Sequence, residues 1–96
     1  MKPVKATVWN PAKYLETDEQ VLIYLEDIFK KGKAELIATA IGDVARAQGM
    51  SKVAAETNRG RASLYKSLSE NGNPSFETIL KVLDSLGFGL LPDPRT

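Results

Sequence analysis

The sequence predicts an all-α domain of five helices that follows an extended N-terminal arm. Apolar residues recur at the three- and four-residue spacing of a helix face, and no stretch shows the strict alternation of a half-buried strand. Glycine, asparagine and proline residues separate the periodic stretches and act as helix ends or turns. The stretches cover residues 17–31, 34–48, 50–57, 61–69 and 76–86.

The composition is that of an ordinary folded protein with one domain. Of the 96 residues, 43% are hydrophobic and 26% are charged, so we expect a single compact core. There are 13 basic and 12 acidic residues, which leaves a net charge of +1 that favours no particular partner. We assign residues 1–16 to the arm, residues 17–91 to the domain and residues 92–96 to a short tail.

Cysteine and histidine are both absent, which excludes disulfides, thiolate nucleophiles, Cys/His zinc sites and the usual neutral-pH proton shuttle. Acidic residues such as Asp18 and Glu26 occupy helix-start or exposed positions, with no accompanying base or nucleophile. We therefore expect no enzymatic activity, catalytic residue, metal site or cofactor. No apolar run approaches the roughly 20 residues of a membrane span, and the N-terminus lacks a signal-peptide core, which predicts a cytoplasmic protein.

The predicted arm contains Pro3 and Pro11 and shows no helical periodicity, so we expect extended backbone there. Its aromatic residues Trp9 and Tyr14 need a surface to cover. Two interpretations stay open: these side chains pack on the first two helices, or they form a partner interface, where aromatic residues are enriched. The apolar segment Phe88–Leu91 near the C-terminus has the same two interpretations: it packs on the core, or it contacts a partner.

Local signals set the ends of the helices. Thr17 followed three residues later by Gln20 fits a capping box at the start of the first helix, and Ser75 can cap the last. Gly42 costs about 1 kcal/mol relative to alanine inside the second helix. Glycines follow three of the helices and can end them: Gly32, Gly49 and Gly87.

Two short helices around a tight turn lie at the centre of the sequence, over about residues 50–69. The second of them commits only Leu64 and Leu68 to a core, fewer than the usual three or four apolar residues per two turns. The first presents Val53 and the small Ala54 inward, which allows close approach of the second helix. This pattern is typical of a helix-turn-helix motif.

The residues outside that small core favour contact with DNA. In a helix-turn-helix the second helix lies in the major groove, and its N-terminal residues reach base edges. We expect Arg61 to bond guanine, Ala62 to touch a thymine methyl and Lys66 to read a further base. The alternative for these three residues is a merely solvated helix face, and Tyr65 could instead pack its ring beneath the motif. Residues of the types that hold phosphates surround the base readers: Lys52, Arg59, Ser63, Tyr65, Asn71 and Asn73.

The second half of the chain contains the stretch GMSKVAAETNRGRASLYKSLSENGNPSFETILKVLDSLGFGL. Its G-M-S followed by V-A, its S-L-Y-K-S-L-S, its G-N-P-S-F-E-T and its terminal L-G resemble the helix-turn-helix antitoxins of bacterial addiction modules. The specific group is the HigA-like antidote proteins, within the lambda-repressor-like domains. The resemblance extends upstream to W-N-P-A-K-Y-L and G-D-V-A-R-A-Q-G-M, so it covers nearly the whole chain.

This resemblance implies a five-helix lambda-repressor-like domain that binds operator DNA as a dimer and represses its own promoter. It also implies direct neutralisation of a small RelE/ParE-like toxin, for which Trp9 and Tyr14 are candidate contacts. One departure is the turn Asn58-Arg59-Gly60, where the family more often has glycine, an apolar residue and serine or threonine. Asn58 tolerates the left-handed backbone that the turn requires, and glycine at position 60 is an acceptable cap.

Two other functions remain open. A protein-interaction module would inhibit the toxin with little DNA affinity of its own, and the near-neutral net charge favours it slightly. A stand-alone phage-type repressor would share the DNA chemistry but have no toxin. Complex formation with the product of the neighbouring gene separates this last possibility from the antitoxin.

Overall fold

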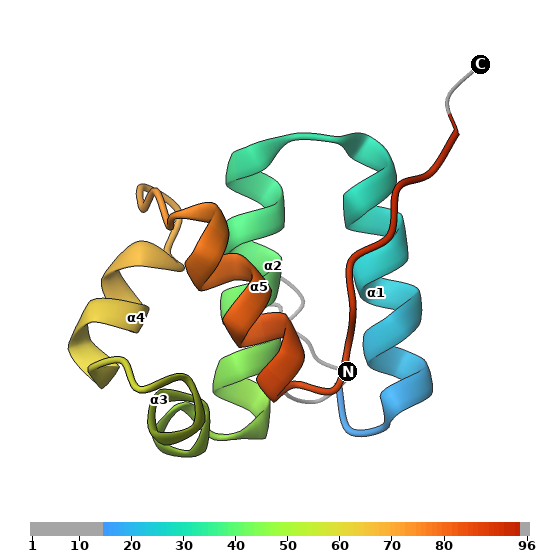
Figure 1. Cartoon of the computed structure of the whole chain (residues 1–96). Helices are drawn as coiled ribbons and strands as arrows, with labels where there is room; N and C mark the ends of the chain where they lie inside the picture. The colour runs from blue at the N-terminus through green and yellow to red at the C-terminus, as the bar shows by residue number, and fades with distance from the viewer. Residues whose placement is uncertain (1–14, 95–96) are drawn as a thin grey trace, which may run out of the picture.

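The computed structural model describes residues 15–94, in which five helices and no strand occur (Figure 1). The all-α prediction is confirmed for these residues. The second short helix was expected to reach about Ser69 but ends at Ser67, because the backbone at Leu68 leaves the helical conformation (φ −99°, ψ 29°). The helices are α1 (Asp18–Lys31), α2 (Ala34–Gln48), α3 (Met50–Thr57), α4 (Arg61–Ser67) and α5 (Phe76–Ser85).

The predicted caps of α1 and α5 are present. The Thr17 hydroxyl accepts a hydrogen bond from the Gln20 amide at 3.1 Å, and the Gln20 side chain accepts one from the Thr17 amide at 3.1 Å. The Ser75 hydroxyl accepts from the Thr78 amide at 3.1 Å. These bonds satisfy amides that have no partner within the helix, and therefore fix where each helix begins.

Helix α2 lies at the centre of the fold, since it packs against each of the other four helices (Figure 1). Leu15, at the end of the predicted arm, also belongs to this core and is only 4% exposed. None of the helices in residues 15–94 is long and apolar enough to span a membrane. The largest fully buried side chains come from all five helices and the α4 cap: Val21, Ile41, Val44, Val53, Leu64, Leu68 and Val82.

The end of α5 redirects the chain toward α1. Gly87 adopts a positive φ of 91°, its amide donates to the Asp84 carbonyl at 3.0 Å, and the Phe88 amide donates to the Leu83 carbonyl at 2.9 Å. This is the hydrogen-bond pattern of a Schellman motif. Phe88 then packs on the core, and the C-terminal segment runs alongside α1 (Figure 1). Leu91 in that segment is 85% exposed.

Candidate nucleic-acid interface

The turn between α3 and α4 reverses the chain within three residues. Asn58 has left-handed backbone angles (φ 57°, ψ 41°), as expected for a residue type that tolerates this region. Its amide donates to the Ala55 carbonyl at 3.3 Å, and the Arg59 amide donates to the Ala54 carbonyl at 3.0 Å. Gly60 is extended and precedes α4. The end of α3 is thereby closed by backbone bonds, and α4 starts in a fixed direction.

The two short helices share a small buried contact. Leu64 and Leu68 are 1% and 0% exposed, and Val53 and Ala54 of α3 are buried as predicted. Thr57 is also buried, and its hydroxyl donates to the Val53 carbonyl at 2.8 Å, which satisfies a polar group inside the core. The contact therefore anchors α4 through one edge only.

Gly42 of α2 allows the end of α4 to approach closely. A Cβ atom at this position would overlap the carbonyl oxygen of Leu68 and would lie 3.0 Å from the Leu68 Cβ atom. The helix-propensity cost of Gly42 therefore has a structural reason, because a larger residue would force α2 and the end of α4 apart.

The outward face of α4 consists of exposed side chains of the types expected there. Ala62 and Lys66 lie two residues before and after Leu64, so they project from the side of the helix opposite the buried edge. Arg61 and Tyr65, four residues apart, share one flank. Tyr65 is 39% exposed rather than buried beneath the motif. The structure thus brings Arg61, Ala62, Ser63, Tyr65 and Lys66 together on one short, open helix.

The expected phosphate contacts outside α4 divide into two groups. Lys52, Asn71 and Asn73 are exposed at the start of α3 and in the loop before α5. Arg59 is half-buried, and its Nη2 atom lies 3.6 Å from the Glu77 carboxylate of α5. Its Nε atom is buried without a hydrogen-bond partner. The Arg59 charge is therefore partly compensated within the molecule.

A family model described as "Probable addiction module antidote protein" matches residues 5–92. This chain belongs to that family. A protein of Haemophilus influenzae described as "Uncharacterized protein" is 43% identical to this chain over 78 residues, which cover 81% of this chain and 80% of the relative. No solved structure gave a significant match. Family membership supports an antitoxin function, and an antidote implies a toxin partner of some kind.

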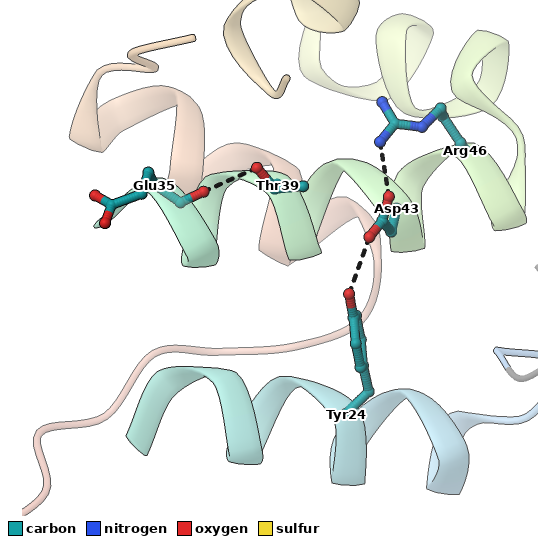
Figure 2. Close-up of polar contacts among 5 residues, drawn as sticks. All are labelled: Tyr24, Glu35, Thr39, Asp43 and Arg46. Atoms are coloured by element: carbon teal, nitrogen blue, oxygen red, sulfur yellow. Dashed lines mark hydrogen bonds and ion pairs between the residues drawn. The ribbon is translucent and has the colours of Figure 1, made fainter. Parts of the chain in front are cut away.

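A polar network lies beside the α2–α4 contact. The Tyr24 hydroxyl of α1 donates to the Asp43 carboxylate of α2 at 2.9 Å, and Arg46 donates to the same carboxylate at 2.8 Å (Figure 2). Burial and the bond to Asp43 raise the pKa of the Tyr24 phenol well above its ordinary value. The Arg46 guanidinium borders Gly42, where α2 meets the end of α4. The network therefore connects α1 with the helix that supports α4.

The sequence did not reveal two polar pairs near the interface. Arg59 of the turn pairs with Glu77 of α5, and the Ser85 hydroxyl of α5 donates to the Glu56 carboxylate of α3 at 2.6 Å. Both pairs join residues far apart in the chain, so no local spacing signals them. The aromatic candidates of the arm, Trp9 and Tyr14, lie outside the described residues 15–94.

Proposed function

We propose that this chain is a HigA-like antitoxin that binds operator DNA as a dimer and represses its own promoter. Helices α3 and α4 would act as a lambda-repressor-like helix-turn-helix. The main support is the burial pattern of α4. Leu64 is its one buried residue, and its basic and hydroxyl-bearing residues are left outside the core. A helix that packs against its own domain through one edge can place the rest of its surface in the major groove of DNA.

Within this proposal Arg61, Ala62 and Lys66 read bases, because they begin or face outward from α4. Lys52, Ser63, Tyr65, Asn71 and Asn73 hold phosphates around them. Arg59 belongs to the same set, but it would have to share its guanidinium between a phosphate and Glu77.

We also propose that this cytoplasmic antitoxin neutralises a RelE/ParE-like toxin by direct binding. The support is its membership of the antidote family, which implies a toxin partner. Trp9 and Tyr14 of the arm remain candidates for the partner interface, with packing of these side chains on the helices as the alternative that the sequence leaves open. Co-expression with the product of the neighbouring gene tests this: a stable complex supports the proposal, whereas failure to form one leaves a stand-alone repressor.

Fluorescence anisotropy tests the DNA function, with a duplex of the chain's own upstream DNA and a scrambled duplex across a salt series. We expect tighter binding to the upstream duplex and a steep fall of affinity with salt. Arg61→Ala should weaken binding to the upstream duplex by roughly 1–3 kcal/mol and relax the preference at one base pair. Lys66→Ala should also weaken binding to the upstream duplex. Lys33→Ala, which removes an exposed charge between α1 and α2, is its matched control and should leave binding nearly unchanged.

An interaction module with little DNA affinity is the second candidate. The Arg59–Glu77 pair and the net charge of +1 favour it, since both limit the positive potential available to phosphates. Weak and equal binding to both duplexes would support this candidate and contradict operator recognition by the isolated chain.

A further inference from the structure

A groove of about 520 Å³ lies between α1 and the C-terminal segment. Leu22, Leu25 and Phe29 of α1 form one wall, and Phe88 and Leu91 contribute to the other. Although it is apolar at its base, the groove is not filled by the described residues: Leu22 is 45% exposed and Leu91 is 85% exposed. Exposed apolar surface of this kind marks a place where another segment packs.

We propose that this groove is the docking site of the chain's own N-terminal segment, residues 2–13, with the Trp9 indole seated at the end lined by Leu22 and Glu26. A tryptophan can bury more apolar surface than most other side chains, and its N–H needs a polar partner at the edge of the groove. The Glu26 carboxylate lines the same end and can accept that bond.

The number of residues between Trp9 and the buried Leu15 limits how far along α1 the Trp9 side chain can reach. Leu15 is buried beside the start of α1, and Trp9 precedes it by six positions along the chain, a reach of at most about 20 Å. With a rise of about 1.5 Å per residue, Leu22 lies roughly 6 Å and Glu26 roughly 12 Å along α1 from its first residue, Asp18. Trp9 can therefore reach this near end of the groove but not much beyond Phe29.

Charge complementarity favours the same occupant. The segment contains Lys2, Lys5 and Lys13 and no acidic residue. Glu19 and Glu26, seven residues apart on α1, lie on the same face as Leu22. A basic segment with apolar residues therefore matches an apolar groove beside exposed carboxylates.

Intrinsic fluorescence tests the proposal in the full chain, because Trp9 is its only tryptophan. We expect the folded chain to show blue-shifted emission and reduced acrylamide quenching relative to the same chain in denaturant, unchanged on dilution. Leu22→Asp should abolish both effects. Ile23→Asp, at a neighbouring position that is 68% exposed and does not line the groove, is the matched control and should retain them.

Circular dichroism of both variants establishes that the helices remain folded. Solvent-exposed emission from the folded wild type would overturn the proposal, as would equal effects of the two substitutions. Loss of the blue shift on dilution would also overturn it, because the segment would then occupy the groove of a second copy. None of these outcomes depends on DNA binding, so the proposed operator function stands or fails separately.

Discussion

The Tyr24 hydroxyl donates a hydrogen bond of 2.9 Å to the Asp43 carboxylate and so joins α1 to α2 (Figure 2). The other oxygen of the same carboxylate accepts from Arg46 at 2.8 Å. The Asp43 carboxylate therefore accepts one hydrogen bond from α1 and one from its own helix, α2. Its side chain is only 16% exposed. Hydrogen bonds to a charged group in such surroundings are stronger than bonds between neutral groups.

Tyr24→Phe removes the donor and leaves the ring in place. We expect a loss of about 1.5–3 kcal/mol in the free energy of unfolding, the usual range for a hydrogen bond to a charged group. Urea denaturation measures this loss. Tyr65→Phe, which removes the hydroxyl of an exposed tyrosine on α4, is the control and should leave stability nearly unchanged. Equal effects of the two substitutions would show that the Asp43 bond contributes little.

The raised pKa of Tyr24 predicts a loss of stability in alkali. Below the ordinary tyrosine value of about 10, the phenol is protonated in both states and its bond to Asp43 is fully present. Above that value the unfolded chain releases the proton while the folded chain retains it, so stability falls as pH rises toward the folded pKa. Lysines titrate in the same range, so the measurement is the difference in unfolding free energy between wild type and Tyr24→Phe. That difference should shrink between about pH 9 and about pH 11.

Local features of this fold were predictable from the sequence. The Thr17–Gln20 capping box and the Ser75 cap depend on residues three positions apart, and both occur where the sequence placed them. The burial of Leu64 and Leu68 was predictable because four-residue spacing puts both side chains on one edge of a helix. Signals of this kind need no knowledge of how the helices pack.

Contacts between helices were not predictable in the same way. The Tyr24–Asp43 bond joins residues 19 positions apart, and the Arg59–Glu77 pair joins a turn to a separate helix. Neither has a spacing that a single sequence can reveal, because each depends on how two helices are placed. The base and phosphate roles of the α4 residues remain predictions, since residue type and exposure alone do not identify a DNA contact.

Gly42→Ala should destabilise the protein, although alanine favours a helix by about 1 kcal/mol. The added methyl group would overlap the Leu68 carbonyl oxygen, so α2 and the end of α4 must separate. Overpacking of this kind typically costs about 1–3 kcal/mol. Thermal unfolding measures the change. Gly89→Ala, where no atom lies within 4 Å of the new methyl group, is the matched control. A stabilised Gly42→Ala protein would mean that the two helices do not meet closely.

Glu77→Gln should strengthen DNA binding if Arg59 contacts a phosphate. The Glu77 carboxylate lies 3.6 Å from the Arg59 guanidinium, so it both neutralises that charge and repels phosphate. Removing its charge should raise affinity for upstream and scrambled duplexes alike, and should steepen the salt dependence by about one phosphate contact.

Anisotropy titrations across a salt series measure this effect, with Glu19→Gln as a control that makes the same change of charge at the start of α1. In an Arg59→Ala background, Glu77→Gln should lose most of its effect, because the guanidinium that it releases is absent. An equal gain with and without Arg59 would instead assign the change to general repulsion between Glu77 and DNA, or to release of Lys81, whose Nζ atom also lies 3.6 Å from the Glu77 carboxylate.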